Sequence, residues 1–478
     1  QWLTIMEAEV LNQVLIILCP LHHLKLAAFE CLISYLKLNI ININLLLYIY
    51  PRMYCLKKIV ILLAITTFAF PQKVYIHAGR LIDGITEIPV EMVTIIINGS
   101  TIQSILRGHI NPQFESDKLI NLKDYTLLPG LMDMHTHLSG ESNPKSYMEK
   151  FYMDLDEYAY RSIPYAEKTL MAGFTTVREL GGVISNSLRD AIRSGYVVGP
   201  RIFSAGKAIA TTGGHADPSS GLNMNFTSDL GPKDGVINGT SDARKAVRQR
   251  YKNGADLIKI TATGGVLSVA KNSKNPQFTE QEIKAIVETA QDYDMHVAAH
   301  AHGPEGMKRA IRAGVHSIEH GTIMDGEVLA LMKKYGTYYI PTISAGMFVA
   351  AKAKEPGYYP QIIVPKALEI GPRLLNTFTT AYKFGIKIAF GTDSGVSYHG
   401  ENAKEFLYMV KGGMSEMEAI RSATVVASEL LGIDDKLGTI ESGKIADIIA
   451  VTGNPVKDIT SLQSVVFVMK EGIIYKSE

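Results

Sequence analysis

The chain has 478 residues, a length that fits one large domain or two to three ordinary ones. Its formal net charge of +1 gives no electrostatic reason to expect a nucleic acid or an anionic membrane as a partner, and no Lys/Arg block interleaved with aromatic residues occurs. The three cysteines, Cys19, Cys31 and Cys55, lie near the start of the chain. Beyond them, disulfides, thiolate ligands and a Cys nucleophile are excluded, so a metal would need His, Asp, Glu or a modified Lys.

The first part of the sequence differs from the rest. Residues 1–52 are rich in Ile, Leu, Asn and Tyr without a helical or strand period, and we interpret them as an over-extended reading frame that starts properly at Met53. The alternative is a membrane anchor. After Met53, two lysines precede the apolar stretch Ile59–Phe70, which is too short to span a bilayer comfortably. We therefore expect residues 53–71 to be a signal peptide and the mature protein to be periplasmic or secreted, with no stable membrane partner.

Both ends of the remaining chain have sequence patterns typical of short β-strands. KVYIHAGRLIDG and MVTIIINGSTIQSIL contain apolar runs separated by Gly and Asn turns, and SVVFVMKEGIIYK repeats this pattern at the other end. We predict one small β-sandwich domain assembled from residues 72–128 and 436–478. The segment between them would then be inserted as a second, larger domain.

That segment, residues 129–435, alternates strand and helix signals. Short apolar runs ending in polar or Gly residues recur, among them GLMDMHTHL, GFTTVREL, DLIKITATGG, HVAAHAHG and HSIEHGT. Amphipathic stretches lie between several of them, and TEQEIKAIVETAQDYD opens with a capping box of Thr279 and Glu282. The pattern predicts an α/β fold, a catalytic (β/α)₈ TIM barrel. An open doubly wound sheet is the alternative, but the Gly-rich phosphate turn that it needs after its first strand is missing.

Four histidines stand at the C-terminal ends of predicted strands, which is where barrel active sites are built: His135, His137, His300 and His320. The first two form an HxH pair, and alternate residues of a strand point the same way. Asp393 ends the eighth predicted strand in AFGTDSG. A buried carboxylate needs a partner, and a metal ion would supply one. Each motif alone could have a purely structural role; Asp393, for example, could cap its own turn. Their common position at the C-terminal ends of predicted strands favours a metal site.

Lys259 lies inside the apolar strand DLIKITATGG. An ammonium that points into a barrel is costly to bury. Either it reaches solvent or an acid, or CO₂ converts it to a carbamate whose oxygens can bridge two divalent ions. Spacing does not decide between these interpretations.

Together the motifs PGLMDMHTHL, GFTTVREL, TATGGV, HVAAHAHG, SIEHGT and GTDSG resemble the imidazolonepropionase-related branch of the amidohydrolase superfamily. They are most similar to its metal-dependent Xaa-Pro and Xaa-Arg dipeptidases, or prolidase-like carboxypeptidases, and to the fungal ochratoxinase, over about residues 72–478. The resemblance implies that His135, His137 and Asp393 bind a buried metal. It also implies that His300 and His320 bind a second metal and that carboxylated Lys259 bridges the two.

The resemblance further implies that His215 of GGHAD and His302 of HAHG contact the substrate, although loop structure and support of His300 are their alternative roles. The expected function is binuclear, metal-dependent hydrolysis of the amide bond in a dipeptide or N-acyl amino acid with a free carboxylate. Zinc is the expected metal, with manganese, cobalt or iron as alternatives. Relatives often form symmetric oligomers, so a homo-oligomer is expected.

Two other functions stay open at this point. Ring opening of a cyclic amide, or deamination of a heterocycle, would use the same scaffold with about one metal per chain. The non-enzymatic alternative is a catalytically silent, membrane-anchored binding protein. The presence of all six candidate metal ligands disfavours this alternative.

Overall fold

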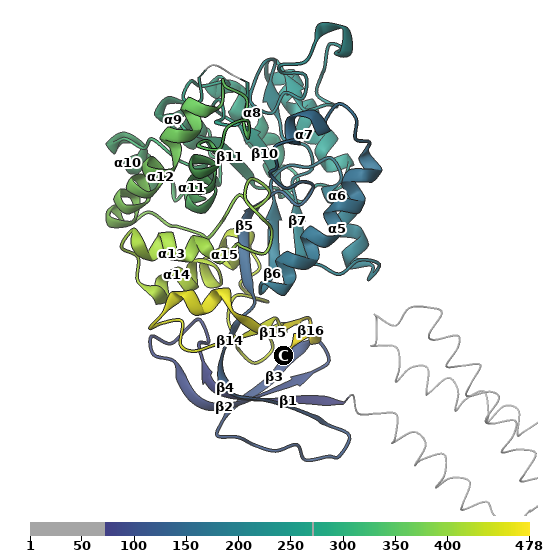
Figure 1. Cartoon of the computed structure of the whole chain (residues 1–478), viewed down its shortest axis with the longest axis vertical. Helices are drawn as coiled ribbons and strands as arrows, with labels where there is room; N and C mark the ends of the chain where they lie inside the picture. Colours follow the sequence, from purple (N-terminus) through teal and green to yellow (C-terminus); the bar gives the residue numbers. More distant parts are fainter. Residues whose placement is uncertain (1–71, 270–271) are drawn as a thin grey trace, which may run out of the picture. The chain divides into compact units, whose positions relative to one another are not determined.

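Strands from both ends of the described chain share one sheet in the computed structural model, which describes residues 72–478 apart from 270–271 (Figure 1). The sheet has seven strands in the order β16-β15-β14-β4-β1-β2-β3. Its strands are β1 (Lys73–Leu81), β2 (Val90–Asn98), β3 (Thr101–Arg107), β4 (Lys118–Pro129), β14 (Ile448–Thr452), β15 (Val465–Lys470) and β16 (Ile473–Ser477). The two ends meet at β4, which pairs parallel with β1 and antiparallel with β14. The β-sandwich itself stays a prediction.

The middle of the chain holds parallel strands, as the alternating pattern predicted. Three strands form one parallel sheet and four form another, with a short β8-β9 pair beside them. They are β5 (Leu131–Thr136), β6 (Phe174–Glu179), β7 (Arg201–Ser204), β8 (Ala210–Thr211), β9 (Val236–Ile237), β10 (Ile258–Thr261), β11 (Val297–Ala301), β12 (Ser317–His320) and β13 (Tyr338–Ile340). The mixed α/β class is thereby confirmed.

Backbone hydrogen bonds join the two parallel sheets at both edges. On one side, the backbone nitrogen of Asp256, just before β10, donates to the Ser204 carbonyl at the end of β7 at 2.7 Å, and the Ile209 nitrogen beside β8 donates to the Lys259 carbonyl of β10 at 2.8 Å. On the other side, the extended segment 387–393 lies between β13 and β5, because the Ala389 nitrogen donates to Tyr339 and the Met134 nitrogen donates to Phe390. Asp393 therefore ends a segment that runs beside the HxH strand.

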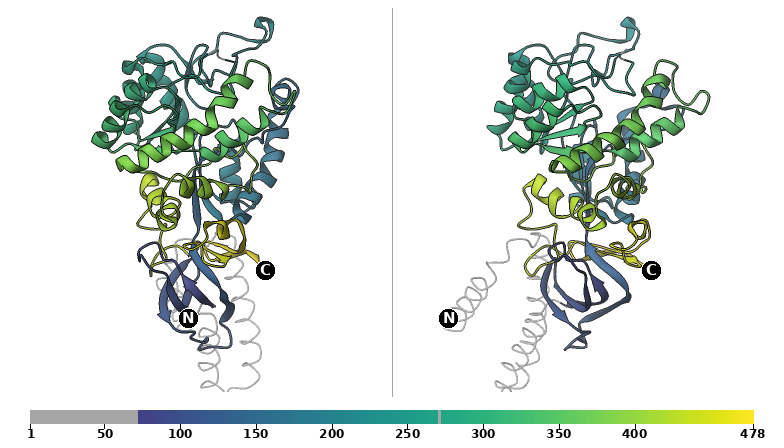
Figure 2. Two further views of the ribbon diagram at one scale, coloured as in Figure 1. Left: turned by 60° about the vertical axis from the view of Figure 1, so that its left-hand side comes forward. Right: turned by 90° about the vertical axis from the view of Figure 1, so that its left-hand side faces the viewer.

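Helices follow most of these strands and lie outside them (Figures 1 and 2). They are α4 (Ser146–Glu149), α5 (Leu155–Met171), α6 (Ser185–Arg193), α7 (Thr240–Lys252), α8 (Glu280–Gln291), α9 (Pro304–Arg312), α10 (Gly326–Tyr335), α11 (Ile343–Lys352), α12 (Val364–Phe384), α13 (Lys404–Lys411), α14 (Glu416–Ser422) and α15 (Val425–Leu431), with two short 3₁₀ turns, Met224–Phe226 and Ile459–Gln463. The capping box predicted for Thr279 and Glu282 starts α8. The apolar faces of these helices pack on the strands and form the main core.

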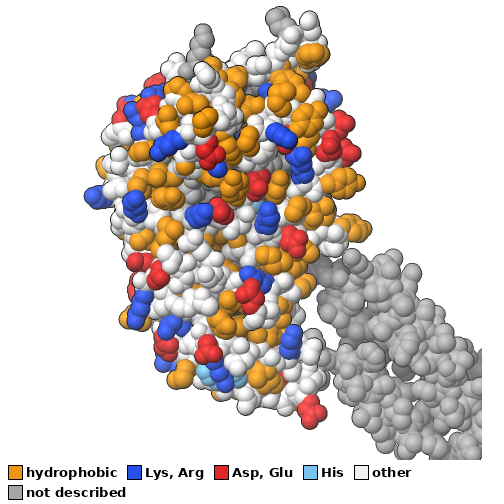
Figure 3. Space-filling model, viewed as in Figure 1, with side chains coloured by type: hydrophobic (Ala, Val, Ile, Leu, Met, Phe, Trp, Pro, Cys, Tyr) orange, Lys and Arg blue, Asp and Glu red, His pale blue; other side chains and the backbone are white. Residues whose placement is uncertain are grey.

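The predicted signal peptide, residues 53–71, and the preceding residues 1–52 lie outside the described part of the chain. Within the described part, no helix combines the length and the apolar character needed to cross a bilayer. Basic and acidic side chains intermingle on the face shown in Figure 3, in keeping with the near-zero net charge.

Candidate metal centre and substrate pocket

One pocket brings together all eight residues that the sequence singled out. Its cavity measures about 410 Å³, a size suited to a small molecule. The predicted residues that line it are His135, His137, His215, Lys259, His300, His302, His320 and Asp393. Most of them lie at or just beyond the C-terminal ends of the parallel strands β5, β10, β11 and β12, the edge where a barrel builds its site.

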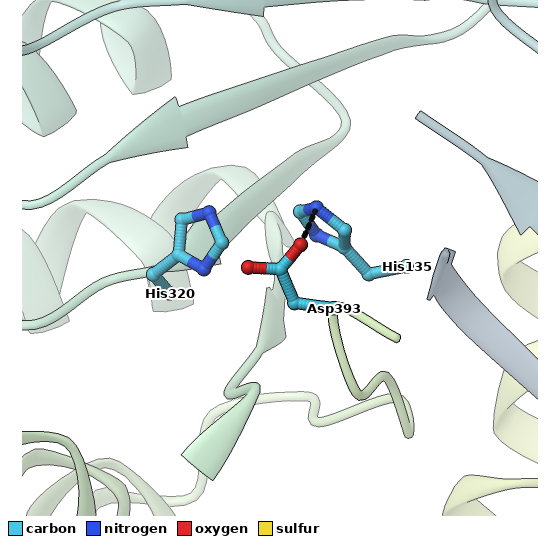
Figure 4. A group of neighbouring side chains, drawn as sticks. All are labelled: His135, His320 and Asp393. Atoms are coloured by element: carbon cyan, nitrogen blue, oxygen red, sulfur yellow. Dashed lines mark ion pairs between the residues drawn. The ribbon is translucent and has the colours of Figure 1, made fainter. Parts of the chain in front are cut away.

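Asp393 lies at the centre of the histidine group. One of its carboxylate oxygens is 3.4 Å from Nε2 of His135 and 3.2 Å from Nε2 of His137. In Figure 4 the other oxygen points toward His320. Ligand atoms of His135, His320 and Asp393 all lie within 4.8 Å of one another, which is close enough for one metal ion to bind all three.

Hydrogen bonds orient the two rings of the HxH pair. Nδ1 of His135 is 2.9 Å from a carboxylate oxygen of Glu319, and Nδ1 of His137 is 3.1 Å from the Gly181 carbonyl. Those oxygens accept, so both rings carry a proton on Nδ1 and turn Nε2 toward Asp393. Nε2 of His135 is buried and has no hydrogen-bond partner among the described residues. A cation would satisfy this lone pair, so the donor set fits a metal.

The second pair of histidines lies beside the first. The ring of His320 is 4.9 Å from that of His135 and 4.7 Å from that of His300, centroid to centroid. Nε2 of His300 donates to the Gly264 carbonyl at 3.1 Å, which leaves its Nδ1 as the free ligand atom. Burial holds the pKa of both rings well below the ordinary value, so both are neutral near pH 7, the form that binds metals.

Lys259 is buried in the same lumen. Its side chain makes no hydrogen bond or salt bridge with any residue that the structure describes, and only 3% of the residue is exposed. Burial lowers its pKa to about 8 despite the nearby carboxylates of Glu319 and Asp393. The neutral amine, the form that reacts with CO₂, is therefore populated near neutral pH. Among the described residues, no acid pairs with Lys259, and its side chain lines the pocket.

Backbone strain concentrates at this pocket. Among the described residues, six non-glycine residues have a positive φ in the left-handed region. Three of them line the pocket: His320 (φ 68°), Thr342 (φ 51°) and Asp393 (φ 58°). Such conformations cost free energy in residues with a side chain and are typical of functional sites.

Sequence reasoning missed a buried chain of charges behind His135. Arg178, on β6, donates to a Glu319 oxygen at 2.8 Å, and the other Glu319 oxygen accepts from His135. Burial alone would raise the pKa of Glu319, but Arg178 and His135 outweigh it and lower the pKa to about 2. A partial signal was present, because Arg178 and Glu319 are charged residues inside the short predicted strands GFTTVREL and HSIEHGT.

A second missed residue is Asp133, which extends the HxH pair to DxHxH. Its two carboxylate oxygens accept from the backbone nitrogen of His135 at 3.0 Å and from the side-chain amide of Asn402 at 2.8 Å. They also accept from the backbone nitrogen of Thr392 at 3.1 Å and from its hydroxyl at 2.6 Å. Asp133 thus fixes the HxH strand against the residue that precedes Asp393. Burial raises its pKa to about 6.

His215 and His302 complete the polar part of the pocket. Both rings pack on that of His300, at 4.4 and 4.6 Å between centroids. Nδ1 of His302 is 2.6 Å from the Thr322 hydroxyl, whereas the buried Nδ1 of His215 has no partner among the described residues. Both positions are compatible with contact to a bound molecule.

Comparisons with known proteins show which family and which solved structures the chain resembles. A model of the family described as "Amidohydrolase family" matches residues 126–476. Ochratoxinase from Aspergillus niger is 32% identical over 423 residues, covering 84% of this chain and 86% of that protein. A Xaa-Pro dipeptidase crystallised with methionine in its active site is 53% identical, with a TM-score of 0.83, and covers 85% of this chain and 100% of that one. A prolidase complexed with N-methylphosphonate-L-proline is 30% identical, with a TM-score of 0.77 and the same coverage.

Proposed function

Because the chain belongs to the amidohydrolase family, we propose that it cleaves the amide bond of a dipeptide or N-acyl amino acid with a free C-terminal carboxylate, using two divalent metal ions. The coarser statement is established: the chain is a hydrolase that acts on amide bonds, similar to prolidases and ochratoxinase. The observation that carries the finer proposal is the convergence of four imidazoles, Lys259 and Asp393 on one pocket.

We also propose that the parallel strands close into the predicted eight-stranded barrel, residues 129–435. The links at both sheet edges support this, with segment 387–393 as the eighth strand. Closure would explain why side chains from β5 and β12, far apart in sequence, meet across one lumen. Export through a signal peptide at residues 53–71 stays part of the proposal.

The pocket offers ligands for two ions. His135, His137 and Asp393 would hold the more buried ion, His300 and His320 would hold the other, and a carboxylated Lys259 would bridge them. Zinc suits such a histidine-rich donor set, although manganese, cobalt and iron share these ligands. When bound, the ions would lower the pKa of water toward neutrality and polarise the substrate carbonyl.

The chain's own groups would manage the proton and the substrate. Asp393 accepts the proton of the attacking water on a carboxylate oxygen and delivers it to the nitrogen of the departing amine. Its readiness to accept depends on starting as a carboxylate: burial would raise its pKa, but His135 and His137 keep it below the ordinary value. His215 and His302 would hold the substrate carboxylate through charge-assisted hydrogen bonds, fixing the amide in register.

The similar proteins suggest an order of preference among the candidate substrates. Similarity to a Xaa-Pro dipeptidase and to a prolidase bound to a phosphonate analogue containing proline supports Xaa-Pro first. Xaa-Arg/Lys dipeptides and N-acyl amino acids follow. Cyclic-amide hydrolysis or deamination, with one metal, and a silent binding protein are the competing functions.

The deciding experiment is a substrate panel combined with metal analysis. We expect the purified protein, loaded with Zn²⁺, to hold about two ions per chain, to cleave dipeptides or N-acyl amino acids, and to lose this activity on chelation. About one ion per chain together with activity on cyclic amides or heterocycles would contradict the proposal. Two bound ions with no hydrolysis of any compound would instead support the silent binding protein.

Glu319→Gln tests the charge chain behind His135. The amide can still accept from Arg178 but no longer favours the proton on Nδ1 of His135 as a carboxylate does. We therefore expect metal affinity to fall by roughly 10- to 100-fold, measured by competition with a chromogenic chelator. Asp447→Asn is the matched control, because Asp447 is also buried and pairs with an arginine, Arg201, outside the pocket. Equal metal affinity in the two variants would exclude a role for Glu319 at the site.

A further inference from the structure

We propose that the wall formed by α11 and α12 is a subsite for an apolar side chain of the substrate's C-terminal residue, so that the enzyme prefers apolar C-terminal residues and rejects Arg and Lys. This inference rests on the proposed function and narrows it. It separates the Xaa-Pro and N-acyl options from the Xaa-Arg/Lys option, which the ligand residues alone leave open.

The wall consists of side chains without a polar atom. From α11 come Ala345, Gly346 and Val349, and from α12 come Ile370 and Leu374; all five line the pocket. A side chain at Gly346 would overlap Leu374, so the two helices cross closely there and the wall has little room to shift. A charged side chain placed against this surface would lose its hydration without gaining a partner.

The wall adjoins the histidine to which we assign the substrate carboxylate. A small neighbouring cavity is lined jointly by His302, Val266 and Ile370, so His302 lies next to the α12 end of the wall. A residue whose carboxylate is held at His302 therefore has its own side chain within reach of Ile370. This places the C-terminal residue of the substrate, rather than its acyl half, on the wall.

The charges around this subsite favour an anion and oppose a cation. Lys366 of α12 donates to the carbonyls of Gly265 and Ser268 at 3.3 and 2.6 Å and lines the small cavity beside Ile370, so it places a positive charge at this end of the wall. The nearest acid of α12, Glu369, already pairs with Lys274 at 3.3 Å and Arg373 at 2.5 Å. No described acid beside the wall is thus left to receive a basic side chain.

The remaining pocket acid outside the metal ligands does not change this conclusion. Asp234 lines the pocket from the loop that precedes β9, not from α11 or α12. Its charge interacts favourably with the buried guanidinium of Arg250, whose Nε donates to the Lys207 carbonyl at 2.6 Å. This interaction offsets part of the negative charge of Asp234.

The test measures binding and hydrolysis separately. Calorimetric binding of free methionine and free arginine to the Zn²⁺-loaded protein probes the subsite without chemistry, and hydrolysis of Gly-Met, Gly-Ala and Gly-Arg probes it during turnover. We expect methionine to bind at least about tenfold more tightly than arginine, and Gly-Met to be cleaved with a kcat/KM at least about tenfold above that of Gly-Arg.

Two variants of one wall residue give opposite changes in space. Val349→Phe should narrow the subsite and lower kcat/KM for Gly-Met about tenfold more than for Gly-Ala, whereas Val349→Ala should weaken methionine binding several-fold and lower kcat/KM for Gly-Met more than for Gly-Ala. Val328→Ala is the matched control, because Val328 is an equally buried helical valine that does not line the pocket. Val349→Ala provides the test if Val349→Phe does not fold.

The outcomes distinguish failure of the proposed subsite from failure of the proposed hydrolysis. Equal binding of arginine and methionine, binding of neither, or equal effects of the Val349 and Val328 substitutions would overturn the subsite. Preferential methionine binding that is lost in the Val349 variants, without hydrolysis of any peptide, would retain the subsite and overturn the proposed hydrolysis instead.

Discussion

Asp393→Asn should lower kcat by roughly 10²- to 10⁴-fold while the protein keeps its metal. The amide has nearly the shape of the carboxylate and keeps one oxygen for a ligand contact near His135 and His137, which lie 3.4 and 3.2 Å away. It cannot accept a proton near neutral pH. The departing nitrogen would then have to leave as an amide anion, a far poorer leaving group than a neutral amine.

The measurement needs metal content and turnover from the same sample. Asp447→Asn serves again as control, since it removes a buried carboxylate outside the pocket and should change stability rather than kcat. Near-normal turnover in Asp393→Asn would refute the proton-transfer role. Loss of metal together with turnover would show that Asp393 acts mainly as a ligand.

The sequence predicted the ligand set because parallel strands impose a simple rule. Each candidate followed an apolar run, and the C-terminal ends of parallel strands meet at one edge, so His135, His300, His320 and Asp393 converge in the structure without further information. Lys259 was found by a different rule, the cost of burying a charge. Applied consistently, that rule would also have found Arg178 and Glu319, which are equally buried.

What remained hidden depends on which strands and helices face each other. Sequence spacing does not indicate that Arg178 on β6 reaches Glu319 on β12, 141 residues away. Nor does it show that Asp133 ties the HxH strand to Thr392, or that α11 and α12 cross closely enough to form the pocket wall. The segment 387–393 was expected as a regular strand, yet it joins its neighbours through isolated bridges, and Asp393 at its end has a positive φ.

Lys259→Ala should lose most of the bound metal and nearly all turnover. If Lys259 carries a carbamate, the substitution removes the one anionic oxygen ligand that reaches both ions, and two cations then face each other without the bridge. Added bicarbonate should not restore the site, because no amine remains to react. Short-chain carboxylic acids, which fit the vacated space and supply a carboxylate, should restore metal content and activity in part.

The competing interpretation, an unmodified ammonium, makes the opposite prediction for metal binding. A buried ammonium repels cations, so Lys259→Met, which keeps the length and removes the amine, should then bind metal more tightly than the natural chain. Under the carbamate interpretation the same variant binds metal more weakly. The zinc affinity of Lys259→Met, measured by chelator competition, therefore decides between the two interpretations: weaker binding than in the natural chain supports the carbamate, and tighter binding supports the ammonium. Native mass spectrometry of the metal-loaded natural protein should in addition detect the added mass of one CO₂. Because the substitution removes a buried, unpaired amine and keeps a similar side-chain volume, the metal-free variant should unfold at a temperature no lower than the natural chain, which separates loss of a ligand from loss of the fold.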